Sequence, residues 1–294
     1  MSRFLEADAP QVNRRDFLSR SALFAGYCAL SCDLKAQQPN AAYGVPPVQA
    51  LDDKNVIQGR VTFTSGTEDL DGYLARPNKK GRFPTVVIVA GNPPYEEYVR
   101  NFAAMFAQIG LVGIAPNIYS VQKGATTLAQ LRKILAEKIT DEKIFGDIRS
   151  SISYAKEQGF GISNRVAVTG FCFGGRCALM FAATYPKEVR AVVPFYGNLQ
   201  TPAFADRKLD PIDAVARIRA PVLGHYAEND PEIPLAQLKD FEASLKKKNS
   251  NAQIFTYAGA RHGFFAHTQP TYDAAVSKIA WERTVVFLKK YLGQ

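Results

Sequence analysis

One stretch near the middle of the chain constrains its fold more strongly than any other feature. Residues 166–169 form an apolar run typical of a β-strand, which breaks at the pattern Gly-x-Cys-x-Gly-Gly over residues 170–175 before helical periodicity begins. This pattern is typical of a nucleophile elbow, a sharp turn from strand to helix that presents a nucleophile at its apex. Glycine is needed at Gly170 and Gly174 because the turn presses these positions together. The sequence therefore predicts Cys172 as the nucleophile.

A cysteine at this apex gains reactivity from the helix that follows it. The first turn of a helix points free N–H groups and a partial positive charge toward the apex, which favours the thiolate, the form that attacks. The alternative interpretation is that Cys172 is a small buried residue, which is the usual position of a free cysteine. That alternative does not require glycine two residues away on each side, so we favour the nucleophile.

Strand-like and helix-like segments alternate from residue 56 to the C-terminus. Apolar runs typical of strands covered on both faces lie at residues 85–90, 111–115, 166–169, 191–196, 221–226 and 253–257. Helical periodicity follows the elbow and is also found at residues 96–108, 128–158, 235–247 and 272–291. This alternation predicts an α/β fold with a mostly parallel sheet, helices on both faces, and an antiparallel hairpin over residues 61–75. We expect one domain over residues 56–294, after an extended approach over residues 37–55.

Two loops at the carboxyl ends of predicted strands carry the remaining catalytic candidates. In sheets of this kind the working residues gather at those ends. The loop at residues 227–231 contains Asp230, and the loop at residues 258–264 contains His262. With Cys172 they give the chain order nucleophile, acid, histidine, which is the order of the α/β-hydrolase fold.

The expected roles follow from the chemistry of the side chains. His262 would accept the thiol proton and later give a proton to the leaving group. Asp230 would fix the tautomer of the imidazole and stabilise its cation, with Glu228 as the rival acid in the same loop. His225 lies within a predicted strand and His267 lies well past the loop, so His262 is the expected base.

The oxyanion that forms on attack needs backbone N–H donors. One donor should be Phe173, directly after the nucleophile, and the second should come from the loop that follows residues 85–90. That loop begins Gly91-Asn92 and continues with two prolines, which have no N–H to donate. We expect Asn92 to be the second donor, with Gly91 as the alternative.

These motifs together resemble the dienelactone hydrolase family of α/β hydrolases. The resemblance rests on the cysteine elbow, the Asn229-Asp230 pair, the run His262-Gly263-Phe264, and residues 193–197, and it covers roughly residue 56 to the C-terminus. It implies a Cys-His-Asp triad that cleaves a small carboxylic ester or lactone through a thioester acyl-enzyme, as a carboxymethylenebutenolidase does. It also implies that no metal or organic cofactor takes part.

The chain departs from the family pattern close to the nucleophile. Family members usually carry a glutamate, in the loop after residues 85–90, that interacts with the resting cysteine, whereas this chain has Ala90-Gly91. With no carboxylate near the sulfur, the pKa of Cys172 is expected to fall toward that of a Cys-His ion pair. Glu96 or Glu97 is the alternative source of a carboxylate.

The lining of the substrate pocket is predicted less directly. Aromatic side chains that follow predicted strands or the elbow would suit an apolar acyl group, although aromatics also fill cores: Tyr95, Tyr119, Phe171, Tyr196 and Phe264. The arginines with which dienelactone enzymes hold a substrate carboxylate are replaced by Val121 and Ala266. Candidate replacement cations are Lys123, Arg176, Arg261 and His267.

The first 36 residues resemble a targeting segment. Residues 13–18 read Asn-Arg-Arg-Asp-Phe-Leu, and an apolar run at residues 22–30 follows. This resembles a twin-arginine export signal, which is read by the export machinery and is not part of the fold. We therefore expect a periplasmic or secreted protein, and a cytoplasmic protein with an amphipathic N-terminal arm is the alternative.

Composition narrows the class of protein further. The chain of 294 residues is 47% hydrophobic and 21% charged, which is ordinary for a globular protein, and no stretch approaches the length of an apolar membrane span. The formal net charge of +9 comes from scattered bases, with one cluster at residues 246–248, so we expect no nucleic-acid partner. The main alternative to a hydrolase is a catalytically reduced family member that binds a ligand.

Overall fold

The computed structural model describes residues 44, 46–91, 97–120, 133, 137–200, 207 and 209–293 of the chain. The expected leader, residues 1–36, lies outside the described residues. So do four candidates from the sequence: Asn92, Tyr95, Glu96 and Lys123. The expected helix at residues 128–158 is described in full only from residue 137 onward.

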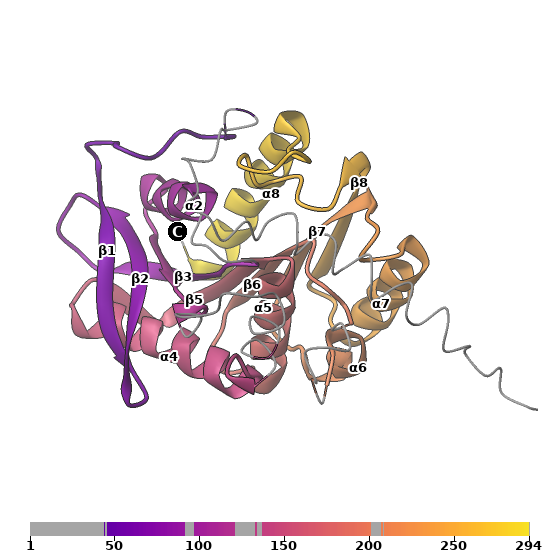
Figure 1. Cartoon of the computed structure of the whole chain (residues 1–294), viewed down its shortest axis with the longest axis horizontal. Helices are drawn as coiled ribbons and strands as arrows, with labels where there is room; N and C mark the ends of the chain where they lie inside the picture. Colours follow the sequence, from indigo (N-terminus) through magenta and orange to yellow (C-terminus); the bar gives the residue numbers. More distant parts are fainter. Residues whose placement is uncertain are drawn as a thin grey trace, which may run out of the picture.

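One eight-stranded sheet forms the centre of the molecule (Figure 1). In spatial order its strands are β1 (Val56–Ser65), β2 (Glu68–Pro77), β4 (Val112–Pro116), β3 (Phe83–Val89), β5 (Gly161–Phe171), β6 (Ala191–Phe195), β7 (Val222–Asn229) and β8 (Ala252–Arg261). β1 pairs with β2, and β2 with β4, in antiparallel fashion, whereas the remaining pairs are parallel. The predicted α/β-hydrolase fold is confirmed, with the antiparallel hairpin at the sheet edge.

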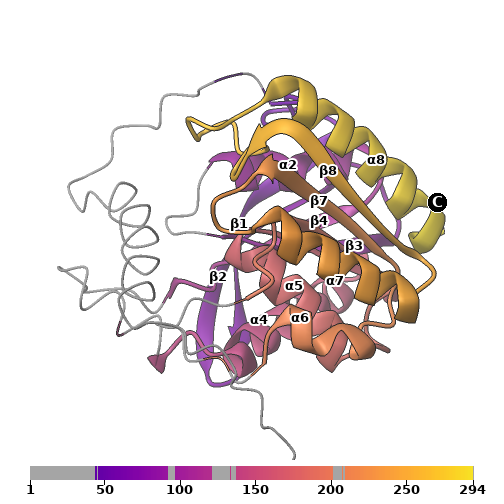
Figure 2. The ribbon, with the colours of Figure 1, turned by 90° about the vertical axis from the view of Figure 1, so that its right-hand side faces the viewer.

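Helices cover both faces of the sheet (Figure 2). One face carries α2 (Glu97–Gln108) and α8 (Ala274–Leu292), and the opposite face carries α4 (Asp141–Glu157), α5 (Phe173–Thr184) and α7 (Leu235–Lys248). The short helices α6 (Pro211–Ala214) and η3 (Val215–Arg217) lead into β7. α4 begins after Thr140, an N-cap within the expected 128–158 segment, whose side chain accepts a hydrogen bond from the Lys143 N–H.

The strands read as apolar runs because both of their faces are covered. All seven residues of β3 are buried, whereas most positions of the edge strand β1 are exposed or half-buried. On the α2 and α8 face, Phe102 is the centre of an aromatic cluster that also contains Phe106, Phe171, Phe195, Phe265 and Trp281. This packing holds the carboxyl ends of β5 and β6 rigidly in place.

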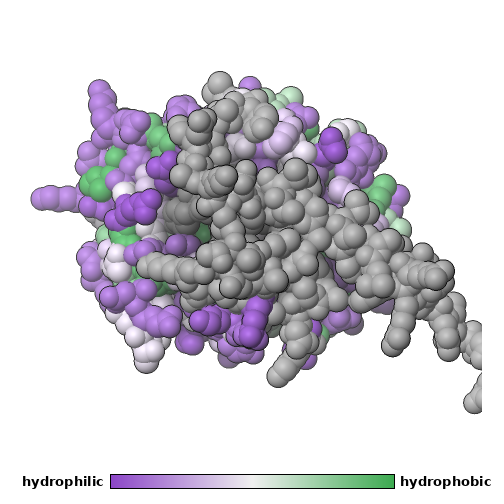
Figure 3. Space-filling view, viewed as in Figure 1, coloured by the Kyte–Doolittle hydropathy of each residue, from purple (hydrophilic) through white to green (hydrophobic). Residues whose placement is uncertain are grey.

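The visible surface of the described residues is largely hydrophilic, with small separate apolar areas (Figure 3). The large hydrophobic side chains that are exposed, Ile57, Ile279 and Val286, are few. Within the described residues, no helix combines the length and the apolar character needed to cross a bilayer.

A candidate active site at the carboxyl ends of the strands

The strand-turn-helix geometry predicted at the elbow is present. β5 ends at Phe171, α5 begins at Phe173, and Cys172 between them has φ 54° and ψ −121°. A positive φ is uncommon for a residue other than glycine, so the backbone at the apex is strained. This conformation turns the side chain of Cys172 out of both the sheet and the helix.

The close packing of the elbow explains the flanking glycines. A Cβ on Gly170 would lie 2.3 Å from the carbonyl oxygen of Gly174, and a Cβ on Gly174 would lie 2.0 Å from the carbonyl oxygen of Val89. Real Cβ atoms do not approach backbone oxygens this closely. The two glycines are therefore required by the contact of the elbow with itself and with β3.

Asp230 and His262 meet because the strands before them are in register. Asn229 at the end of β7 pairs with Arg261 at the end of β8, so the next residue of each chain segment emerges at the same edge of the sheet. Nδ1 of His262 lies 2.7 Å from Oδ2 of Asp230, and both side chains are buried. Such a bond fixes the imidazole orientation and leaves Nε2 facing the elbow.

The backbone of its own loop holds the Asp230 carboxylate. Oδ1 accepts hydrogen bonds from the N–H groups of Glu232 at 2.8 Å and Ile233 at 3.2 Å. The rival acid, Glu228, is exposed, and its Oε2 accepts a bond from the N–H of Gly259 at 3.0 Å. The structure therefore places Asp230, and not Glu228, against the histidine.

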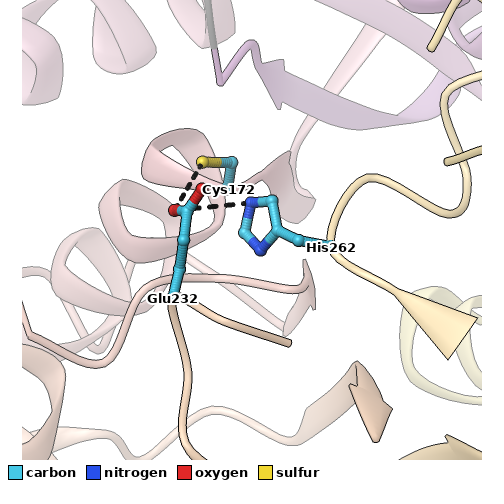
Figure 4. A group of neighbouring side chains, drawn as sticks. All are labelled: Cys172, Glu232 and His262. Atoms are coloured by element: carbon cyan, nitrogen blue, oxygen red, sulfur yellow. Dashed lines mark hydrogen bonds and ion pairs between the residues drawn. The ribbon is translucent and has the colours of Figure 1, made fainter. Parts of the chain in front are cut away.

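A second carboxylate, absent from the sequence-based prediction, lies beside the sulfur (Figure 4). Oε2 of Glu232 is 3.8 Å from Sγ of Cys172 and 3.6 Å from Nε2 of His262. Asn198, which follows β6, donates from Nδ2 to the same Oε2 at 3.0 Å, and its Oδ1 lies 3.5 Å from Sγ. Glu232 therefore bridges the two proposed reacting groups, and Asn198 holds it there.

Sequence reasoning missed Glu232 and Asn198 although both lie close to predicted elements. Glu232 is two residues beyond Asp230, and Asn198 directly follows the family-like residues 193–197. Their signal was position on a loop at the carboxyl end of a strand. That position alone does not say which way a side chain turns.

The expectation of a sulfur free of carboxylates is wrong. A side chain at Gly91 has no room, because a Cβ there would lie 2.5 Å from the carbonyl oxygen of Phe171 and 2.9 Å from Cβ of Cys172. Of the two alternative glutamates, Glu97 begins α2 and lies 3.5 Å from His267, away from the elbow, and Glu96 is outside the described residues. The carboxylate comes instead from Glu232 on the acid loop.

This arrangement reverses the expected pKa shift of the nucleophile. Burial raises the pKa of the Cys172 thiol, the charge of Glu232 raises it further, and His262 and the Phe173 N–H oppose them only in part. Burial and Glu232 thus favour the thiol over the thiolate. The elbow provides a potential nucleophile that needs a base.

Negative charges around His262 stabilise its cation. Burial disfavours its cation, but the negative charges of a Cys172 thiolate and of Asp230, together with the hydrogen bond from Asp230, raise the pKa of His262 well above 6.5. While Cys172 is protonated its charge is missing, so Asp230 supplies the stabilisation that operates in the resting site.

The described part of the expected oxyanion site is consistent with its role. The N–H of Phe173 is directed at the sulfur, where it favours the anion. Asn92 lies outside the described residues, but Gly91, which precedes it, is fixed by a 2.6 Å hydrogen bond from the Tyr119 hydroxyl to its carbonyl oxygen. Tyr119 thus anchors the start of the loop that is expected to carry the second donor.

The other pocket candidates lie largely in the packed interior. Phe264 is fully buried between Tyr196 and Tyr257, and Phe171 belongs to the aromatic cluster around Phe102. The ring of Tyr196 lies 4.9 Å from that of His262 and so forms a wall of the histidine. Tyr196 thus contacts a member of the proposed triad.

Arg176 is a structural cation. Its side chain is fully buried, and it donates two hydrogen bonds to the carboxylate of Asp141, one to Asp210, and one to the carbonyl oxygen of Leu209. Arg207 pairs with the same Asp141 at 3.5 Å. Since the guanidinium is occupied by α4 and by the segment before α6, we do not carry Arg176 into the substrate site.

The donors of Cys172, Glu232 and His262 are of the types that zinc accepts, and they lie within 4.8 Å of one another. Among the described residues no other group of three such side chains is this compact. The same three atoms are also a thiol, a carboxylate and an imidazole placed for proton transfer. We interpret them in that second way because the sulfur lies at a strained elbow, which a structural metal site does not require.

A mostly parallel sheet that carries a cysteine elbow, followed by an acid and a histidine on later loops, defines an α/β hydrolase. The sequence model of the dienelactone hydrolase family matches residues 70–292. The chain belongs to the dienelactone hydrolase family.

Several relatives are similar over most of their length. The "Putative carboxymethylenebutenolidase" of Methylorubrum extorquens is 29% identical over 289 residues, covering 97% of this chain and 98% of the relative. The "Probable 2-oxo-3-(5-oxofuran-2-ylidene)propanoate lactonase" of a Bradyrhizobium species is 30% identical, covering 78% and 92%. Among solved structures, a "Putative Dienelactone Hydrolase" from Klebsiella pneumoniae superposes with a TM-score of 0.73 at 30% identity, covering 80% of this chain and 99% of that one.

Proposed function

We propose that this dienelactone-hydrolase-like protein cleaves a small carboxylic ester or lactone through a covalent thioester on Cys172. One observation carries the proposal: His262, oriented by Asp230 at 2.7 Å, faces the sulfur of a strained elbow. Membership of the family and the lactone or butenolide substrates named for its relatives support the same chemistry.

The first half-reaction transfers the acyl group to sulfur. His262 takes the thiol proton at Nε2, Sγ forms a bond to the substrate carbonyl carbon, and the carbonyl oxygen becomes an oxyanion near the Phe173 N–H. The intermediate then collapses, the carbon–oxygen bond to the leaving group breaks, and the imidazolium protonates the departing alcohol oxygen. Asp230 stabilises the imidazolium throughout.

The second half-reaction releases the acid. His262 accepts a proton from water, the water oxygen attacks the thioester carbon, and the carbon–sulfur bond breaks. The sulfur regains a proton from the imidazolium, which restores the neutral thiol. In a lactone the alcohol and the acid remain in one product molecule.

Glu232 lies beside the path of the first proton transfer. Its Oε2 is 3.8 Å from Sγ and 3.6 Å from Nε2, and the three side chains offer ligand atoms within 4.8 Å of one another, so the sulfur and the imidazole are already close in the resting site. The glutamate side chain is 13% exposed at the rim of the site, where Asn198 holds it. A substrate that approaches Sγ therefore meets this carboxylate.

Turnover of p-nitrophenyl acetate tests the proposal. We expect hydrolysis by the wild-type protein, loss of activity in both Cys172→Ala and His262→Ala, and an acetylated protein in intact mass spectra of the acid-quenched wild type but of neither variant. Equal rates for the wild type and Cys172→Ala would rule out the proposed nucleophile. Cys177 serves as an internal control, since it is fully buried and its thiol pKa is raised to about 12.

We also propose that residues 1–36 direct export through the twin-arginine route. The basis is the sequence pattern at residues 13–18. Cell fractionation of the full chain and of the double variant Arg14→Lys, Arg15→Lys tests this: the wild type is expected outside the cytoplasm and the variant inside. Equal distribution of both would contradict it.

A further inference from the structure

The proposed site carries more negative than positive charge at the reacting atoms. Two carboxylates, Asp230 and Glu232, lie within 4 Å of the imidazole of His262, which can hold at most one positive charge. Cys172 adds no positive charge in either of its states. The centre therefore has a net charge of −1 or a more negative one before a substrate enters.

The carboxylate nearer to the substrate is held in place. Asn198 donates to Oε2 of Glu232 at 3.0 Å, and the backbone N–H of Glu232 is bonded to Asp230. Buried walls surround these groups, including the ring of Tyr196 and the elbow itself. Because low-dielectric walls weaken screening, a charge on an incoming ligand will interact strongly with Glu232.

Two arginines beside the nucleophile, Arg176 and Arg207, do not compensate for this charge. The guanidinium groups of Arg176 and Arg207 lie over the ring of Phe173, next to the nucleophile, at 5.9 and 5.5 Å. Asp141 binds both of them and Asp210 binds Arg176, so two cations are balanced by two anions. This cluster is electrically neutral and stabilises the fold.

We infer that Glu232 is the specificity-determining residue of this site, and that it selects neutral or cationic esters and lactones over those with a carboxylate near the reacting carbonyl. The inference rests on the proposed function for its substrates. Repulsion by Glu232 acts on the acyl group as it approaches Sγ, and so lowers the association of an anionic substrate and the stability of its transition state. The Bradyrhizobium relative is named for a propanoate, which is an anionic substrate, so the inferred selectivity would distinguish this chain from the activity in that name.

Matched substrates test this selectivity. The p-nitrophenyl esters of pentanoate, glutarate and 4-trimethylammoniobutanoate have similar acyl lengths and are neutral, anionic and cationic. We expect kcat/KM of the wild type to be about 10- to 100-fold lower for the anionic ester than for the neutral one, and Glu232→Gln to bring the two within a few-fold. Glu228→Gln is the matched control, because it also removes a carboxylate near the end of β7. The Glu228 carboxylate accepts a hydrogen bond from the Gly259 N–H and does not contact the sulfur.

A second measurement reports the charge effect without hydrolysis. Iodoacetamide is neutral and iodoacetate is anionic, and each alkylates Cys172 by forming a carbon–sulfur bond as iodide leaves. We divide the alkylation rate with iodoacetamide by the rate with iodoacetate, and normalise this ratio to the same ratio for free glutathione. The normalised ratio is expected to be about 10 in the wild type and close to one in Glu232→Gln. Cys172→Ala shows that the signal comes from this sulfur.

The two experiments separate the possible failures. Absence of turnover with all three esters, together with a charge-dependent alkylation ratio, would overturn the proposed function. It would still support the inference that the charge of Glu232 repels anions at Cys172. Turnover with equal rates for all three esters, or ratios that Glu232→Gln leaves unchanged, would overturn the selectivity and leave the hydrolase in place.

Discussion

Oε2 of Glu232 lies 3.8 Å from Sγ of Cys172, although 60 positions separate the two residues in the chain. The glutamate belongs to the loop that also supplies Asp230, so one loop delivers both carboxylates of the site. One of them contacts the proposed base, and the charge of the other raises the pKa of the Cys172 thiol.

Replacing Glu232 with glutamine is expected to make Cys172 more reactive at neutral pH. The glutamate charge raises the thiol pKa, so its removal lowers that pKa and increases the thiolate fraction. The rate of iodoacetamide alkylation against pH should rise at lower pH in the variant than in the wild type. An unchanged profile would mean that burial alone controls the sulfur.

Replacing Asp230 with asparagine is expected to lower kcat by about 100- to 10,000-fold with a small change in KM. The amide removes the charge that stabilises the imidazolium and permits the wrong tautomer of His262. Steady-state ester hydrolysis measures the effect, with Glu228→Gln as the control. A comparable loss in Glu228→Gln would reverse the assignment of the acid.

Replacing Gly174 with alanine is expected to lower the free energy of unfolding by about 3 kcal/mol or to prevent folding. The new Cβ would meet the Val89 carbonyl oxygen at 2.0 Å, and neither backbone segment can yield within the sheet. Gly146→Ala in α4 is the control, since a Cβ there meets no atom within 4 Å. Thermal unfolding should separate the two variants clearly.

Replacing Arg176 with methionine is expected to cost about 3–5 kcal/mol of stability, because the carboxylates of Asp141 and Asp210 lose a fully buried partner. The comparison is Arg149→Met, whose ion pair with Glu188 is largely exposed and should contribute less than about 1 kcal/mol. Denaturant unfolding measures both. A stable Arg176→Met protein with a raised KM would instead place this arginine at the substrate.

Acid is expected to destabilise the protein through His225. This histidine is buried between Tyr257 and Thr284, and burial lowers its pKa to about 3. The unfolded chain, with a pKa of about 6.5, therefore binds more protons, and stability falls as pH drops from 6.5 toward 3 by about 1.4 kcal/mol per pH unit. Urea unfolding at pH 7 and 5 should show a smaller change in His225→Asn than in the wild type.

Local patterns in the chain were sufficient for the scaffold. Apolar runs predicted the buried strands, and their alternation with helical periodicity predicted a parallel sheet covered on both faces. The glycines on either side of Cys172 predicted the elbow, because close approach within a tight turn excludes any Cβ. Such features depend on neighbouring residues, and a sequence displays them directly.

The environment of the sulfur required the tertiary structure. Residues on several loops converge there, and the sequence shows that they share an edge of the sheet but not which side chain turns inward. The sequence favoured Asp230 over Glu228 as the partner of His262, and the structure places Asp230 there. It could not tell that Arg176 is bound by Asp141, or that Glu232 replaces the carboxylate for which Gly91 leaves no room. Strand register and loop conformation decide these contacts. Charges interact according to their separation in space, and separation along the chain does not give that distance.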